Sequence, residues 1–430
     1  MCFKLVLFLF ALMPFVYQGI TLSIIDRKRK EPLPAEVADV YTPERWQTFI
    51  DEKHEMRKPV LAGTALSLLL SVFLIFSPFF KMMEAVSSNV YVLTIVTSIV
   101  LSITETVISL PVRYVQEMVI LTKYGLNKKD NKEFFKDEAI SFLFGMAANT
   151  LMYLFAVYVL DNIESWTNGF SLPLYECFAI MTGIAVSAYA MILAISWISW
   201  LVMRKQYTFT ELEEGELRDQ IIALTEGAKK KIRKIEVYNE SKKSTTKNAF
   251  MLKILNYRQF GIADNFLNEN SERQLLGVLA HEAGHLKHKK NILDYVYYAS
   301  GVVLIIASGL MIPHGSEIAS VVTGIMNSAF GLSRIHYVLV FEMIGWFGQP
   351  LFALFALFLN YKSRWEEYEA DRNSVKEGYG DDLIQLFKEL SKDELVDVNP
   401  ADIIEFLEYD HPGMYHRILA IQKASEQFKA

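Results

Sequence analysis

Seven long apolar segments restrict the fold of this chain more than any other feature of its sequence. A helix of about 20 apolar residues crosses the roughly 30 Å hydrocarbon layer of a bilayer, and each segment is long enough to do so. The sequence therefore predicts a mainly α-helical, polytopic membrane protein with seven transmembrane helices. The predicted spans are approximately 5–25, 59–80, 89–112, 138–160, 173–203, 293–312 and 335–360.

Two long polar stretches interrupt this pattern, and they indicate a small α+β domain outside the bilayer. Alternating polar and apolar residues predict strands, and Ser271 precedes an amphipathic segment typical of a helix. Thr210 with Glu213 is typical of a capping box that starts another helix. The predicted elements are helix 211–227, strands 234–238, 248–255 and 257–263, and helix 272–290. The predicted parts are membrane region 1–203 with spans one to five, cytoplasmic α+β segment 204–292, membrane region 293–360 with spans six and seven, and cytoplasmic helical segment 361–430.

The distribution of Lys and Arg predicts the orientation of the spans. Positive charge collects after the first span and in the 113–137 loop, whereas the 161–172 loop has no Lys or Arg. Because positively charged loops stay on the cytoplasmic side, the N-terminus is expected on the lumenal side. Alternation then places both polar stretches, and any site that they form, on the cytosolic side.

The pentapeptide HEAGH, from His281 to His285, predicts a catalytic zinc site. Residues four apart lie on one face of a helix, so both imidazoles can bind one zinc ion at about 2.0–2.1 Å. Zinc lowers the pKa of bound water to about 7, and Glu282 is placed to act as general base for attack by zinc-bound hydroxide. The alternative to a metal site is a solvated helix whose two histidines lie at the surface. Because the preceding residues are apolar, we favour the buried metal site.

A third protein ligand must come from a distant part of the sequence. His288 lies about 10 Å along the helix from His281, too far to share one ion, so it is expected near the site or at the surface. The acidic residues after the seventh span are candidates: Glu366, Glu367, Glu369 and Asp371. Glu367 and Asp371 share a helical face, so one can bind the metal while the other accepts a hydrogen bond from a ligand imidazole. Spacing alone does not choose among the four.

Several motifs together resemble the type I CAAX prenyl protease family, a group of membrane zinc metalloendopeptidases. HEAGH and the segment Ser363-Arg364…Glu367-Tyr368-Glu369-Ala370-Asp371 resemble its two metal-binding stretches. Further similar segments are Tyr124-Gly125-Leu126-Asn127-Lys128, Glu211 to Arg218, Asn248-Ala249-Phe250, and His411-Pro412 with Arg417. They follow the family's order from about residue 100 to the end. Thr246, Leu286, Asp410 and Gly413 depart from the family pattern without removing a ligand or the base.

The resemblance implies a set of residue roles. His281, His285 and Glu367 would bind one Zn²⁺ per chain, Glu282 would be the base, and Asp371 would support a ligand. His411 and Arg417 would lie near the substrate or the developing oxyanion, and Asn248 and Ala249 would belong to an edge strand that pairs with the peptide. The family encloses a water-filled chamber in the membrane and removes the last three residues after a prenylated cysteine.

The expected partners and location follow from the same resemblance and from charge. We expect prenylated C-termini as substrates, the lipid bilayer as surroundings, a monomer, and the endoplasmic reticulum or nuclear membrane. A net charge of −6 without a sustained basic stripe argues against nucleic acid. Two distant cysteines offer no thiolate metal site.

Two other functions remain open at this stage. A general quality-control metalloprotease without prenyl specificity would use the same ligands, and a non-catalytic membrane protein with a structural metal would need no base. An intramembrane-cleaving protease would place the motif within an apolar span, whereas Lys287, Lys289 and Lys290 follow it here.

Intramembrane acids give one further expectation. Glu105 and Glu342 lie within predicted spans, where a carboxyl group facing lipid is costly. They are therefore expected to face protein or a water-filled interior. Arg113, at the end of its span, is expected to be a positive anchor at the membrane surface rather than a partner of Glu105.

Overall fold

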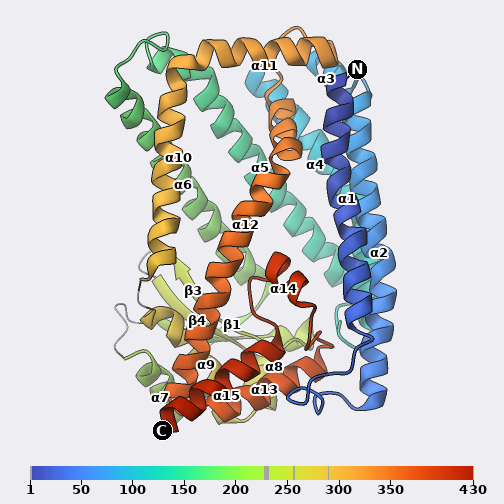
Figure 1. Cartoon of the computed structure of the whole chain (residues 1–430), viewed down its shortest axis with the longest axis vertical. Coiled ribbons are helices and arrows are strands. Elements are labelled where there is room, and N and C mark those ends of the chain that lie inside the picture. The colour runs from blue at the N-terminus through green and yellow to red at the C-terminus, as the bar shows by residue number, and fades with distance from the viewer. Residues whose placement is uncertain (1, 227–231, 255–256, 289, 430) are drawn as a thin grey trace.

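The computed structural model describes residues 2–226, 232–254, 257–288 and 290–429, and within them seven helices are long and apolar enough to cross a membrane. This confirms the predicted polytopic helical fold. The helices are α1 (Cys2–Lys28), α2 (Pro43–Phe76), α4 (Val90–Tyr114) continued by the π-helical η1 (Val115–Leu121), α5 (Asn131–Trp166), α6 (Leu174–Gln206), α10 (Ile292–Met311) and α12 (Tyr337–Lys376). Three short helices lie at the end of the bundle opposite the sheet (Figure 1): α3 (Phe79–Glu84), η3 (Ile312–His314) and α11 (Gly315–Phe330).

Many apolar side chains of these helices are exposed rather than buried. In α6, none of the most apolar 18 residues is buried inside the protein. An apolar surface of this extent is stable only against lipid. Contact with lipid therefore explains why these helices bury few side chains against one another.

A four-stranded sheet lies at one end of the bundle (Figure 1). Its order is β1-β2-β4-β3, with β2 and β4 parallel and the other two pairs antiparallel. Helix α9 packs on the sheet through a core that includes Phe260, Leu276, Leu279 and Ala283. The elements here are β1 (Phe209–Glu211), α7 (Glu216–Leu224), β2 (Lys234–Tyr238), η2 (Glu240–Lys242), β3 (Ala249–Ile254), β4 (Tyr257–Ala263), α8 (Asp264–Glu269) and α9 (Glu272–Lys287).

One local prediction in this region is wrong. Thr210 does not cap a helix that begins at residue 211, because residues 209–211 form β1 and pair with β2. The helix α7 starts only at Glu216, after Gly215, and ends at Leu224. The backbone hydrogen bonds of the sheet outweigh the local capping signal; residue 227, the predicted end, lies outside the described residues. The other strands lie close to where they were predicted. Helix α9 ends at Lys287, before the predicted end at residue 290, because the backbone of His288 is extended; residue 255 and residue 289 are outside the description.

Helix α12 joins the two parts of the protein. Its N-terminal half lies among the membrane helices, and its C-terminal half continues past them to pack against α9 (Figure 1). The chain then ends in α13 (Gly380–Asp393), α14 (Asp402–Glu408) and α15 (Met414–Lys429) at the sheet end of the bundle. The polar stretches 204–292 and 361–430 therefore meet at one end, as the alternation of spans requires.

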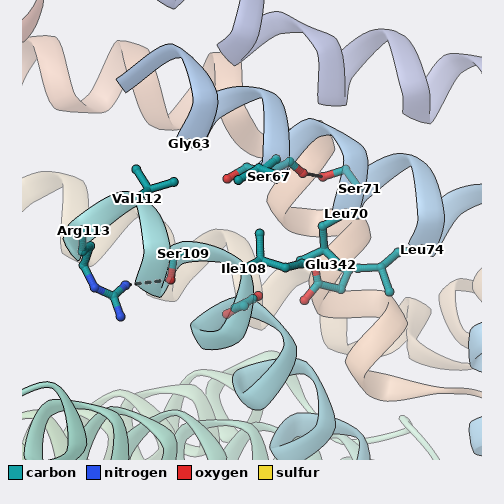
Figure 2. A pocket seen from close by; sticks show the side chains of 12 residues that line it. Gly63, Ser67, Leu70, Ser71, Leu74, Ile108, Ser109, Val112, Arg113 and Glu342 are labelled. Atoms are coloured by element: carbon teal, nitrogen blue, oxygen red, sulfur yellow. Dashed lines mark hydrogen bonds between the residues drawn. The ribbon is translucent and has the colours of Figure 1, made fainter. Parts of the chain in front are cut away.

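The two intramembrane acids face the interior. Glu105 of α4 and Glu342 of α12 line a cavity of about 390 Å³ between α2, α4 and α12. Figure 2 shows Glu342 close to Leu70 and Leu74 of α2, the helix that also carries Ser67 and Ser71. Arg113 does not pair with Glu105; it donates to Glu138 and to Ser109 instead. The two carboxyl groups therefore border one cavity, in agreement with the expectation that they would line the interior.

Candidate metal centre

Helix α9 fixes the direction of the HEAGH side chains. Ser271 and Gln274 form a reciprocal capping box at its start, and the apolar residues after it are buried. This arrangement holds His281 and His285 on one face, with their ring centroids 4.9 Å apart and the rings nearly perpendicular. Glu282 lies between them in sequence and is half-buried.

The motif glycine allows α12 to approach this face. A Cβ atom on Gly284 would lie 2.8 Å from the Ala370 Cα atom, closer than real Cβ contacts allow. Two side chains of α12 also bind backbone carbonyls of α9: Asn373 Nδ2 donates to Ala280 at 2.7 Å, and Ser374 Oγ donates to Gly277 at 2.9 Å. The close packing of the two helices places the acidic face of α12 against the imidazoles.

We expect Gly284→Ala to separate the two helices and to weaken both stability and metal retention. Overpacking of a well-packed contact costs typically about 1–3 kcal/mol, and here the opposing atom is backbone that cannot rotate away. Thermal unfolding in detergent and metal content of the purified protein measure the effect. Gly277→Ala is the matched control on the same helix, because its added Cβ would meet only ordinary contacts at 3.5 Å or more. Equal behaviour of the two variants would contradict the close-approach argument.

Three potential ligands converge on one point. His281 Nε2 lies 3.4 Å from Glu367 Oε2, and His285 Nε2 lies 3.2 Å from Glu367 Oε1. The three ligand atoms all lie within 4.8 Å of one another. Two atoms that each bind one ion tetrahedrally at about 2.0–2.1 Å stand about 3.4 Å apart, so this spacing fits a single zinc ion.

The buried oxygen Oε2 of Glu367 supports the same interpretation. It accepts no hydrogen bond from the residues that the structure describes, although His281 Nε2 and Arg417 Nη2 stand 3.4 and 3.5 Å away. A buried carboxylate oxygen without a donor is costly, and a cation at this point would satisfy it. Two neutral imidazoles, one carboxylate and an open side are the donor set of a catalytic zinc site.

Asp371 and Arg417 support the ligand residues through hydrogen bonds and ion pairs. Asp371 Oδ1 lies 2.8 Å from His281 Nδ1, so that imidazole can donate there and turn Nε2 toward Glu367. Arg417 donates to both oxygens of Asp371, at 2.9 and 2.6 Å, and its guanidinium lies 4.3 Å from the centre of the Phe387 ring. Burial lowers the pKa of His281, but hydrogen bonds with Asp371 and Glu367 outweigh it and raise this pKa to about 9. The surroundings therefore favour positive charge at the position of the metal.

The remaining predicted site residues take different places. His411 is exposed, with Nε2 3.5 Å from Glu367 Oε1, and its imidazole contacts Asp410 through Nδ1. Arg417 is buried next to Glu367 and Asp371, rather than exposed as His411 is. Ala249 begins β3, and the carbonyl of Asn248 accepts a hydrogen bond from the Ala263 N–H, which extends the β3–β4 ladder by one residue. β3 is an edge strand of the sheet.

His288 belongs to a second polar cluster, away from the three ligands. Its Nε2 lies 3.3 Å from Asp294 Oδ2 and 4.0 Å from Glu366 Oε1. These three side chains could also hold an ion, but the Lys362 ammonium already pairs with both carboxylates. The cluster joins the end of α9 to the start of α10, where Asp294 and Asn291 form a capping box.

Sequence reasoning did not identify Asn373 and Ser374. Both follow Asp371 on α12, and the helical spacing from Glu367 to Ser374 places the latter two turns further along the same side. Hydrogen-bonding side chains on the ligand-bearing face were the available signal, but their acceptors are backbone carbonyls of α9 that only the packing reveals.

Comparison with known proteins identifies the family. Residues 211–425 match the model of peptidase family M48, and residues 24–198 match that of the CAAX prenyl protease N-terminal region with five membrane helices. The chain belongs to the CAAX prenyl protease family of M48 peptidases. It is accordingly a multi-pass membrane metalloprotease.

Individual relatives are distant, but the similarity extends over most of the chain. CAAX prenyl protease 1 of Saccharomyces cerevisiae is 25% identical over 360 residues, which cover 81% of this chain and 75% of the relative. An uncharacterized metalloprotease, YhfN of Bacillus subtilis, is 21% identical and covers 80% of this chain and 76% of its own. The crystal structure of S. mikatae Ste24p superposes with a TM-score of 0.75 at 22% identity, covering 97% of this chain and 98% of that one. This similarity shows that the two proteins share a fold.

Proposed function

We propose that this CAAX prenyl protease relative is a zinc endopeptidase that removes the last three residues after a prenylated cysteine. The convergence of His281, His285 and Glu367 on one point carries the proposal. Relatives that bear the name CAAX prenyl protease support the choice of substrate. One Zn²⁺ per chain fits the three ligands, and a monomer would be sufficient because one chain supplies all of them.

Each side chain of the site has its own role in the proposed hydrolysis. When bound, zinc supplies a Lewis acid that activates water and polarises the peptide carbonyl. Glu282, on the same helix as two ligands, takes a proton from the attacking water and passes it to the leaving amine. His411 is exposed beside Glu367 and can donate to the developing oxyanion. Arg417 holds Asp371 and Glu367, so we assign it a positioning role behind the ligands.

The location of the site suits a substrate anchored in the membrane. The ligands are carried by α9 and by the C-terminal half of α12, and Figure 1 shows these segments next to the sheet, where α12 leaves the bundle of membrane helices. We propose a cytosolic site with a lumenal N-terminus, in the endoplasmic reticulum or nuclear membrane. Prenylated C-termini lie at that membrane surface, and the lipid keeps the peptide close to the site.

A pair of matched peptides tests the substrate assignment. We expect a farnesylated peptide ending in Cys and three residues to be cleaved after the cysteine at least about 100-fold more efficiently than the same peptide without the lipid. Burial of only about four methylene equivalents of the lipid, at ~0.8 kcal/mol each, is worth about 3 kcal/mol, which corresponds to that factor. Purified enzyme in detergent and mass spectrometry of the products give kcat/KM and the bond that is cleaved.

Equal cleavage of both peptides would instead favour a general membrane quality-control metalloprotease. The similarity to YhfN, whose name specifies only a metalloprotease, is the observation that keeps this second function open. Both functions use the same ligands and base, so only substrate selectivity separates them.

A further inference from the structure

Helix α14 (Asp402–Glu408) exposes two large apolar side chains, although it lies outside the seven spans. Ile403 and Phe406 are each 49% exposed, and their spacing of three residues places them on one face of the helix. Ile404, by contrast, is fully buried and anchors α14 in the protein. The packing of the helix therefore leaves the Ile403–Phe406 face open to another apolar group.

Helix α14 lies between two membrane helices rather than with the rest of the C-terminal segment. It contacts α12 and α1, and Figure 1 shows it nearer to the membrane helices than α13 and α15 are. Asn360 Nδ2 of α12 donates to the Leu407 carbonyl at 3.4 Å. On the other side, the Tyr17 hydroxyl of α1 interacts with the Glu408 carboxylate. Because Asn360 and Tyr17 belong to predicted spans, the end of α14 lies at the level of the membrane.

Arg364 connects the apolar face to the metal centre. It is buried on α12, one helical turn before Glu367, which corresponds to about 4.5 Å along the axis. Its Nη1 donates to the Glu405 carbonyl at 3.0 Å and to the Tyr409 carbonyl, so it holds the C-terminal end of α14. Its guanidinium also lies 5.9 Å from the centre of the Phe406 ring. Phe406 therefore lies beside the turn of α12 that carries a metal ligand.

His411 places the accessible side of the metal centre next to the same face. Its Nε2 lies 3.5 Å from Glu367 Oε1, and its side chain is 56% exposed. Only residues 407–410 separate it from Phe406, and Arg364 fixes this connection through the Tyr409 carbonyl. A substrate bound beside His411 is therefore close to the exposed apolar face of α14.

We propose that the Ile403–Phe406 face of α14 binds the prenyl chain of the substrate. The inference rests on the proposed prenyl peptidase function and deepens it by assigning a surface to the lipid. The cysteine that carries the lipid also supplies the carbonyl that is attacked, so the prenyl chain begins within a few bonds of the metal centre. An isoprenoid is removed from water by contact with aliphatic and aromatic side chains, and this face offers both.

Phe406→Ala, measured with the two matched peptides described above, tests the assignment. We expect kcat/KM for the farnesylated peptide to fall about tenfold or more, because the aromatic ring supplies the largest apolar area of the face. The loss should appear mainly as a higher KM, since the lipid is bound equally in the ground state and in the transition state. Cleavage of the peptide without the lipid should stay within about twofold of the wild type. Phe406→Leu should keep most of the lipid preference, because a large apolar side chain remains.

Phe428→Ala is the matched control. Phe428 is 53% exposed, similar to Phe406, but it lies near the end of α15 rather than on α14. Its removal should leave kcat/KM for both peptides unchanged. A farnesylated peptide with a photoreactive diazirine on the lipid gives a second measurement that does not depend on turnover. With Glu282→Gln it should label residues 402–408, and Phe406→Ala in that background should reduce this labelling severalfold.

The possible outcomes separate the inference from the proposed function. An equal loss for both peptides would mean that α14 supports His411 rather than the lipid, and it would overturn the inference. An unchanged lipid preference in Phe406→Ala, or labelling confined to other segments, would also overturn it and is the result expected if a membrane lipid covers the face. If the wild type itself does not prefer the farnesylated peptide, the proposed function fails, whereas the preceding outcomes leave that function intact.

Discussion

Glu282→Gln is expected to abolish peptide cleavage while the protein keeps its metal. The glutamine has the size and shape of the glutamate but cannot accept a proton from the attacking water. Loss of a general base costs about 10²- to 10⁴-fold in rate, and here the same group would also deliver the proton to the leaving amine. Glu282 is not one of the three converging ligands, so the metal site should survive. We therefore expect kcat to fall by at least about a thousandfold at unchanged metal content.

Two measurements separate this outcome from a structural effect. Metal analysis of the purified variant should give the wild-type ratio, and its thermal unfolding should match that of the wild type. Glu272→Gln makes the same chemical change at the exposed start of the same helix and should retain activity. If Glu282→Gln still cleaves the farnesylated peptide at more than a tenth of the wild-type rate, Glu282 is not the base. If a cellular effect of the protein survives the change, that effect does not depend on proteolysis.

Glu367→Gln is expected to release the metal and, with it, all activity. An amide is a far weaker zinc ligand than a carboxylate, and the change leaves two imidazoles without their charged partner. If about 10–16 kcal/mol of zinc binding is shared among four ligands, loss of one weakens binding by at least about 100-fold. The buried Arg417, which lies 3.5 Å from Glu367 Oε2, also loses part of its compensating charge. Chelator titration should therefore strip this variant at a much lower chelator concentration than the wild type needs.

Glu369→Gln provides the control for that experiment. Glu369 lies on the same helix, two residues from Glu367, and its carboxylate pairs only loosely with Arg372 at 3.7 Å. The control should keep both metal and activity. A Glu367→Gln variant that retains stoichiometric metal and wild-type cleavage would show that another group completes the site.

The membrane architecture could be predicted from the sequence because its cause is local. A run of about 20 apolar residues has no stable alternative to a helix in lipid, so the seven spans did not depend on tertiary contacts. The HEAGH ligands could also be predicted from the sequence, since the helical repeat alone brings His281 and His285 to one face. The sheet strands followed from alternation, but β1 did not: residues 209–211 pair with β2, and this overrode the local capping signal of Thr210.

The choice of the third ligand needed the fold. From spacing, Glu367 and Asp371 were equivalent members of one helical face, and Glu366 and Glu369 were not excluded. The packing of α12 on α9 decides between them: Gly284 lets the helices approach, Glu367 then faces both Nε2 atoms, and Asp371 reaches the far nitrogen of His281. The position of Arg417 next to these carboxylates depends on a contact between segments more than 40 residues apart.

The sequence by itself determined the elements and the chemistry available to this protein, because hydrophobic length, helical period and ligand type act over short stretches of chain. Only the tertiary structure decided which acidic side chain meets the imidazoles and which residues support it. Those outcomes depend on distances between remote helices and strands, and such distances are set by close packing rather than by any local pattern.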